Sequence, residues 1–149
     1  MEEFWVISLK LITAFILGGM IGIDRSYRQK PAGSRTISLI CLGSTLMMIL
    51  SLDLSELYSD RVADPGRIAA QVVTGIGFLG AGAIIRARGA VHGLTTAATI
   101  WVVAGIGLAI GAGFYGAAVV TTVLVIFVLR IFLKIESHFH DTSIPDDTE

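Results

Sequence analysis

Five apolar runs constrain this chain more than any other feature of its sequence. They cover residues 4–23, 36–52, 67–85, 94–110 and 116–133. As α-helices, runs of this length can cross a hydrocarbon core about 30 Å thick, the short second run standing nearly upright. With 54% hydrophobic and 15% charged residues and a mean hydropathy of +0.78, the chain is far more apolar than a soluble domain of 149 residues. We therefore predict an all-α, polytopic membrane bundle with about five transmembrane helices.

Basic residues predict how this bundle is oriented, because cytoplasmic loops collect Lys and Arg. The first and third connections and the end of the fifth run hold eight of the eleven basic residues, namely Arg25, Arg28, Lys30, Arg35, Arg86, Arg88, Arg130 and Lys134. The second connection is acidic. We expect the N-terminus outside, the first run retained because no signal-peptide cleavage pattern follows it, and the C-terminus in the cytoplasm.

The stretch from residue 64 to 99 is apolar but carries a polar stripe. Arg67, Gln71 and Thr74 recur at helical spacing. In hydrocarbon, polar side chains seek partners on neighbouring helices, and small residues allow close approach. We interpret the stripe as part of a packed polar seam, across which Thr95 and Thr99 face it or else bond back to their own helix. The predicted seam residues are Asp64, Arg67, Gln71, Thr74, Thr95, Thr96 and Thr99.

Two carboxylates stand at the edges of the predicted spans. Asp64 is expected to cap the third helix and to pair with Arg67. Asp24 is expected either in a salt-bridge network or in an inner-face site for an anionic lipid headgroup or a partner. Both are weak Mg²⁺ candidates, because they fall on opposite sides of the bilayer and should not share one ion. The predicted inner-loop binding residues are Asp24, Arg25, Arg28, Lys30 and Arg35.

Glycines recur at spacings that suit close helix packing. Gly18 with Gly22, and Gly107 with Gly111, form GxxxG pairs. We expect packing within the chain from these pairs, and a homodimer interface is the alternative. The glycines predicted to pack helices are Gly18, Gly22, Gly75, Gly77, Gly80 and Gly82.

Enzymatic chemistry is not expected from this sequence. The spans contain no histidine, and the lone Cys41 lies in an apolar run where packing is its expected role. A net charge of −1 gives no basic face for nucleic acid. We expect a membrane domain over residues 1–135 and a disordered polar tail over 136–149. Its His138 and His140 are too weak a pattern to predict a metal site.

Three motifs carry a family resemblance. They read GGMIGIDRSYRQKPAGSRT, DPGRIAAQVVTGIGFLGAGAII and GLTTAATIW. Together they closely resemble the MgtC/SapB family of bacterial inner-membrane proteins, in a short form without the cytoplasmic domain of longer members. The resemblance implies five spans, a link to growth in low magnesium and, in pathogens, to virulence. It also implies binding of the membrane-embedded ATP synthase by some members. Virulence-associated members tend to have Asn where Thr95 stands, and this departure counts against the same activity in this chain.

Two functions of different classes follow as expectations. The first is a non-enzymatic inner-membrane protein of magnesium homeostasis that binds a membrane partner, such as ATP synthase, and associates as a homodimer. Apart from Mg²⁺, no cofactor is expected. The second is a small cation transporter or channel acting as an oligomer, with Asp24 and Asp64 at its two mouths. Lipid or small-molecule handling in a groove by the third and fourth spans is a third possibility.

Overall fold

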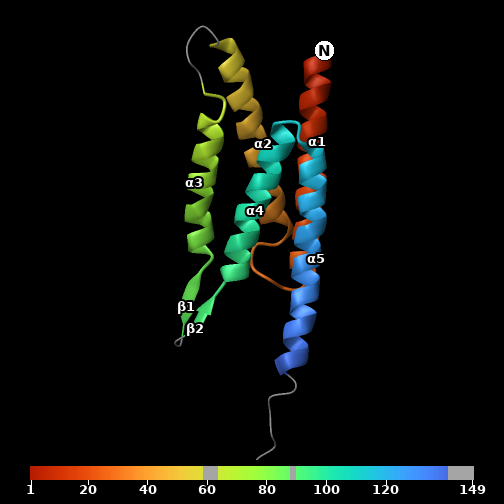
Figure 1. Cartoon of the computed structure of the whole chain (residues 1–149), viewed down its shortest axis with the longest axis vertical. Coiled ribbons are helices and arrows are strands. Elements are labelled where there is room, and N and C mark those ends of the chain that lie inside the picture. The colour runs from red at the N-terminus through yellow and green to blue at the C-terminus, as the bar shows by residue number, and fades with distance from the viewer. Residues whose placement is uncertain (59–63, 88–89, 141–149) are drawn as a thin grey trace, which may run out of the picture.

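The computed structural model describes residues 1–58, 64–87 and 90–140. Within these residues the chain forms five helices that run alternately up and down one axis (Figure 1). This confirms the predicted all-α bundle. The helices are α1 (Glu2–Tyr27), α2 (Ser34–Leu57), α3 (Arg67–Gly82), α4 (Leu94–Gly111) and α5 (Tyr115–His140). The N-terminus and the end of α5 lie at opposite ends of the bundle, as the charge pattern predicts.

Three helices meet the length and composition needed to cross a membrane, namely α1, α2 and α4. In α5 the described apolar stretch is Tyr115–Ile131, within a helix that extends to His140. At a rise of about 1.5 Å per residue, the 16 residues of α3 extend roughly 24 Å, less than a hydrocarbon core. Its run ends early because the third connection begins with a small antiparallel hairpin, β1 (Ile85–Ala87) and β2 (Ala90–His92).

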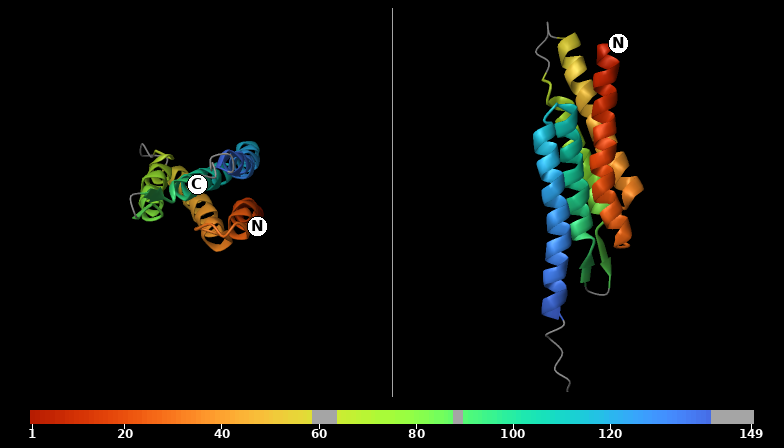
Figure 2. Two further views of the ribbon diagram at one scale, coloured as in Figure 1. Left: turned by 90° about the horizontal axis from the view of Figure 1, so that it is seen from below. Right: turned by 90° about the vertical axis from the view of Figure 1, so that its right-hand side faces the viewer.

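Seen end-on, α4 lies in the middle of the bundle, with α3 and α5 on different sides of it (Figure 2). The α2 helix packs against α4 and also against α1. The buried apolar side chains come mainly from these three central helices, and Cys41 is among them. The fully buried members include Ala14, Ile21, Ile37, Cys41, Val103 and Ile110.

Glycines make the close helix contacts possible. A Cβ on Gly22 would lie 2.6 Å from the Cα of Ser34 in α2, and one on Gly18 would lie 2.7 Å from the Cβ of Cys41. On α4, a Cβ on Gly111 would lie 2.7 Å from the carbonyl oxygen of Thr45. Each distance is too short for a side-chain carbon, so both GxxxG pairs are occupied by contacts within the chain.

The start of α4 depends on a left-handed backbone. Gly93 is its N-cap residue, with a φ of 91°. A Cβ at this position would overlap the carbonyl oxygen of Ala83, just beyond the end of α3. Only glycine combines this φ with so close an approach, and the hairpin therefore returns the chain tightly onto α3.

Two helix ends differ from the sequence prediction. The N-cap of α3 is Gly66 and not Asp64. The Asp64 side chain instead accepts a 2.8 Å hydrogen bond from the Gly66 N–H, which shapes the turn before the helix. At the other end of the chain, α5 continues to His140, so residues 136–140 of the predicted tail are helical. Residues 141–149 lie outside the described residues.

Candidate functional site

An ion-pair cluster lies where α1 ends, and Asp24 is its centre. The Asp24 side chain is 5% exposed and therefore buried. Its Oδ1 accepts a 2.8 Å bond from Nε of Arg130 on α5, and its Oδ2 lies 3.3 Å from Nε of Arg28, one turn further along α1. Of the two alternatives for this residue, the geometry matches the salt-bridge network. The network joins the first and last helices of the bundle.

Arg25 connects three segments beside this cluster. It is 3% exposed, and its Nη2 donates to Oγ1 of Thr96 near the start of α4. The same nitrogen donates to the Pro31 carbonyl oxygen at 3.0 Å. The loop presents that carbonyl through an unusual backbone, because Gln29 and Ala32 both have positive φ values, near 53° and 54°. Arg25 thus holds the α1–α2 loop against α4.

The predicted polar seam is not formed within the chain. Arg67, Gln71 and Thr74 on α3 are all exposed, and the buried residues of this helix are Ile76 and Gly80 on another face. Thr74 bonds back to the Ala70 carbonyl oxygen. The stripe therefore points away from the other helices, because the apolar face of α3 is the one that packs against α2 and α4.

The threonines of α4 divide between separate roles. Thr95 is exposed, whereas Thr96 and Thr99 are buried. Thr99 bonds back to the Thr95 carbonyl oxygen at 2.7 Å, one of the two alternatives that the sequence left open. Thr96 accepts from Arg25. None of the three meets Gln71 or Thr74 through a hydrogen bond in the described part of the chain.

The predicted packing glycines fall into two groups. Gly18 and Gly22 lie at the α1–α2 contact. Gly80 packs against α4, and a Cβ added at Gly80 would lie 3.7 Å from the Cβ of Ala97. For Gly75, Gly77 and Gly82, an added Cβ would meet nothing within 4 Å. The exposed stripe of α3 therefore has open small-residue positions beside its polar side chains.

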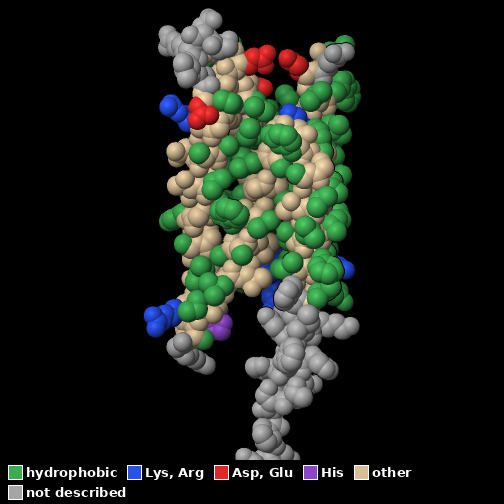
Figure 3. Space-filling view, in the orientation of Figure 1, with side chains coloured by type: hydrophobic (Ala, Val, Ile, Leu, Met, Phe, Trp, Pro, Cys, Tyr) green, Lys and Arg blue, Asp and Glu red, His purple; other side chains and the backbone are tan. Residues whose placement is uncertain are grey.

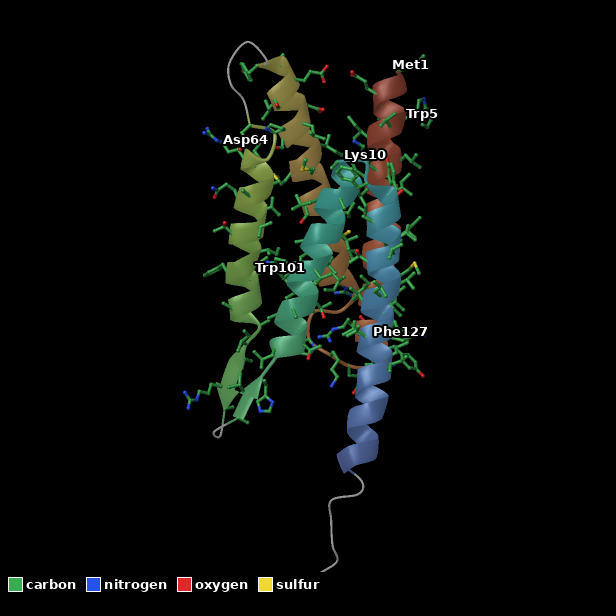
Figure 4. All side chains as sticks on the ribbon, viewed as in Figure 1. Met1, Trp5, Lys10, Asp64, Trp101 and Phe127 are labelled. Atoms are coloured by element: carbon green, nitrogen blue, oxygen red, sulfur yellow. The ribbon has the colours of Figure 1, made fainter. Side chains whose placement is uncertain are left out.

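The two weak metal candidates lie far apart along the bundle. Asp64 is exposed at the upper end in Figure 4, whereas Asp24 lies near the opposite end of α1. No ion pair between Asp64 and Arg67 is present among the described residues, although the Arg67 N–H donates to the Asp64 carbonyl oxygen at 3.1 Å. Within the same residues, no three His, Cys, Asp or Glu side chains are grouped so that they could hold a metal ion.

The two ends of the bundle differ in charge. Asp and Glu side chains gather at the end where the chain begins, and Lys and Arg occur mainly at the other end (Figure 3). At the acidic end a cavity of about 700 Å³ is lined by Glu3, Lys10, Asp53 and Glu56 among others. At the basic end a cavity of about 740 Å³ adjoins Arg25. The basic end is the one that the positive-inside rule predicts to face the cytoplasm.

Sequence reasoning missed two polar contacts between distant segments. Arg130 counted only toward orientation, yet it provides the bond between α5 and Asp24. Lys10 donates from Nζ to the Gly111 carbonyl oxygen at 2.7 Å and so caps the C-terminal end of α4. A single charge inside an apolar run was the only signal for either residue, and it does not indicate a partner.

Taken together, the helices and the separation of charge define a polytopic α-helical membrane protein with a buried ion-pair cluster at its basic end. The model of the MgtC family matches residues 11–138. The chain belongs to this family, as the three motifs led us to expect.

Several relatives share most of this chain. It is 49% identical over 127 residues to the putative magnesium transporter YhiD of Escherichia coli K12. This alignment covers 83% of the chain and 59% of that protein. It is 44% identical over 118 residues to protein MgtC of Salmonella typhimurium, covering 79% of the chain and 48% of the relative. An uncharacterized Haemophilus influenzae protein is 41% identical over 143 residues, or 93% of the chain and 60% of the relative. The chain thus spans about half to three fifths of these relatives' lengths. No solved structure matches.

Proposed function

We propose that this protein is a non-enzymatic component of magnesium homeostasis in the bacterial inner membrane, and that it acts by binding a partner within the bilayer. Membership of the MgtC family and the name of the YhiD relative support the magnesium role. The exposed polar stripe of α3 supports the binding role and carries the proposal.

Exposure of the polar side chains of this stripe to lipid is unfavourable in free energy. The amide of Gln71 and the guanidinium of Arg67 both lie on an exposed face of a helix that is otherwise apolar. On insertion scales an arginine at the bilayer centre costs about 2.5–3.5 kcal/mol, and it is less costly near the interface, where Arg67 begins the helix. A neighbouring helix that hydrogen-bonds these groups removes part of that cost.

The stripe also suits a helix as its partner. Gly75 lies beside Gln71 and Thr74, and Gly82 lies about two turns further along the stripe; at both glycines an added Cβ would meet nothing within 4 Å. Small residues next to hydrogen-bonding side chains let two helix backbones approach closely. A transmembrane helix of another protein, with amide or hydroxyl groups at matching depth, fits this face. ATP synthase, implied by the family resemblance, and a second copy of the chain are both open to test.

Cross-linking in cells tests this proposal directly. Phe78 lies on the stripe and is 82% exposed. Phe127, which is labelled in Figure 4, lies on α5 and is 54% exposed. Each is replaced in turn by the photo-reactive analogue benzoylphenylalanine, a change that keeps the aromatic ring. We expect a discrete cross-linked protein from position 78 and none from position 127. The mass of that product separates a different membrane protein from a second copy.

Two outcomes would contradict the proposal. One is the absence of any discrete product from position 78 in cells grown in low magnesium. The other is full growth in low magnesium with both Gln71→Leu and Arg67→Leu, when each variant is shown to be inserted. Val73→Leu is the matched control, because Val73 is exposed on α3 but lies off the polar stripe.

Cation transport is the second candidate, and one observation favours it. The cavity at the acidic end is lined by three carboxylates, of Glu3, Asp53 and Glu56, and by the ammonium group of Lys10. The described carboxylates are not grouped to ligate a metal ion directly, but their net negative charge would attract a cation that keeps its water shell. Magnesium flux into sealed proteoliposomes tests it, with Asp53→Asn and Glu56→Gln beside empty vesicles. Asp64→Asn is the control, because Asp64 does not line this cavity. Flux that falls in the first two variants only would replace the binding proposal with transport.

A further inference from the structure

The cavity at the basic end is lined by basic side chains and by no described acidic side chain. It has a volume of about 740 Å³ and lies between the end of α1, the α1–α2 loop, the hairpin, the start of α4 and the lower part of α5. Arg25, Lys30 and His92 line it, and no described Asp or Glu does. Every ionisable side chain known to face the cavity can therefore donate a hydrogen bond to an anion.

Arg25 is the buried member of this set and makes no direct ion pair with a described residue. It is 3% exposed, and its Nε is buried and donates to no acceptor among the described residues. The charge of the neighbouring Asp24 acts on Arg25 without direct contact, and the Asp24 carboxylate itself contacts Arg28 and Arg130. Buried charges are normally paired, since taking an unpaired charge out of water costs several kcal/mol or more. An anion in the cavity would supply the direct partner that the Arg25 Nε lacks among the described residues.

The N-terminus of α4 opens on the same cavity. Its N-cap residue is Gly93, and no described side chain caps the helix. Gly93, Leu94, Thr95 and Thr96 all line the cavity. The first N–H groups of an 18-residue helix have no partner within the helix and carry the positive end of its dipole. Together with the buried guanidinium of Arg25, these N–H groups suit the binding of a phosphate group.

An apolar groove continues from the cavity along the bundle. It has a volume of about 260 Å³, lies between α4 and α5, and shares Thr95, Val128 and Leu129 with the cavity. Further along, it is lined by Ala98, Val102 and Leu124, among others. A polar cavity at the cytoplasmic surface that leads into an apolar groove matches a molecule with a charged head and a hydrocarbon chain.

We propose that the cavity binds the phosphate headgroup of an anionic phospholipid of the cytoplasmic leaflet, with one acyl chain in the groove between α4 and α5. Arg25 and Lys30 provide charge, the first N–H groups of α4 and the Thr95 hydroxyl provide hydrogen bonds, and Ala98 contacts the chain. Anionic lipids concentrate in that leaflet and attract basic segments near it. This site goes beyond the proposed role of α3, because it lies on other helices.

Native mass spectrometry of the purified full chain tests the proposal. The detergent-solubilised protein is titrated with phosphatidylglycerol or with phosphatidylcholine of the same acyl chains. We expect preferential binding of phosphatidylglycerol, and about tenfold weaker binding in Lys30→Gln, because one charge-assisted contact is lost. Arg86→Gln is the matched control. It removes a charge from an exposed residue of the hairpin at the same end that does not line the cavity.

A second pair of variants tests the groove. Ala98→Phe fills it and should weaken binding of phosphatidylglycerol, whereas Ala117→Phe, on an exposed part of α5 outside the groove, should not. Thermal unfolding of each variant without lipid verifies that it is folded. Lys30 and Ala98 serve better than Arg25 here, because they are not buried and their replacement leaves the core intact.

Three outcomes would overturn the proposal. The first is equal binding of the two lipids. The second is equal loss in Lys30→Gln and Arg86→Gln, which would mean that only the overall surface charge matters. The third is stabilisation by millimolar inorganic phosphate that Lys30→Gln abolishes and Ala98→Phe leaves unchanged. That result would assign the cavity to a soluble phosphate compound in place of a lipid.

Discussion

Arg130 donates from Nε to Oδ1 of Asp24 at 2.8 Å, although 106 residues separate the two in sequence. The bond joins the last helix of the bundle to the first at the basic end. Much of the outer face of α5 is exposed apolar surface, including Val120, Leu124 and Phe127. Among the described side chains of α5, Arg130 makes a polar contact with another helix through Asp24, and this contact helps to hold α5 in place.

We expect Asp24→Asn to lower the free energy of unfolding by about 1–3 kcal/mol, the range for a buried hydrogen-bonded group that loses its charged partner. The effect stays below that of a fully buried ion pair because the Arg130 side chain is 60% exposed. Equilibrium unfolding in micelles measures it, with Asp53→Asn as the control at the acidic end. A double-mutant cycle with Arg130→Gln should give a measurable coupling energy between the two side chains. A coupling energy of zero would mean that the bond is not formed.

Thr96→Val should destabilise the protein by about 1–2 kcal/mol, because the change removes the hydroxyl that accepts from the buried Arg25 and leaves the guanidinium with one acceptor fewer. The matched control is Thr95→Val, the same change at an exposed neighbour. Thermal unfolding compares the two variants. Equal melting temperatures would contradict a structural role for the Arg25–Thr96 bond.

Gly107→Ala should separate α4 from α2. A Cβ at Gly107 would lie 2.7 Å from the Cβ of Ser44 and closer still to the Cys41 carbonyl oxygen. Overpacking of this kind costs about 1–3 kcal/mol. At Gly105, two residues earlier on the same helix, an added Cβ would meet nothing within 4 Å, so Gly105→Ala should be neutral or slightly stabilising. Unfolding by denaturant distinguishes them, and similar losses in both would show that this contact is not close.

Lys10→Met should lower the free energy of unfolding by about 1 kcal/mol, which is the usual stabilisation by a charge at a helix terminus. The effect should be local to the acidic end of the bundle. The ammonium group of Lys10 donates to the Gly111 carbonyl oxygen at the end of α4, and methionine keeps the stem without the donor. Hydrogen exchange should then increase in the last turn of α4 and not in its first turn. Unchanged exchange at both ends would argue against this cap.

The sequence by itself determined the class of fold, the number of helices and the separation of charge between the two ends of the bundle. The reason is that these properties depend on the length and composition of single segments. An apolar run long enough for a bilayer must satisfy its backbone hydrogen bonds internally, and helices achieve this within one segment. The GxxxG pairs of α1 and α4 also indicated close packing, although not the partner helix.

Only the tertiary structure decided which face of each helix lies inward. The spacing of Arg67, Gln71 and Thr74 predicts one stripe on α3, but periodicity does not state how a helix is rotated against its neighbours. Here the apolar contact through Ile76 and Gly80 turns that stripe outward. The pairing of Asp24 with Arg130, and of Arg25 with Thr96, likewise follows from how whole helices pack. Each bond depends on side chains that approach only after the backbones are in place.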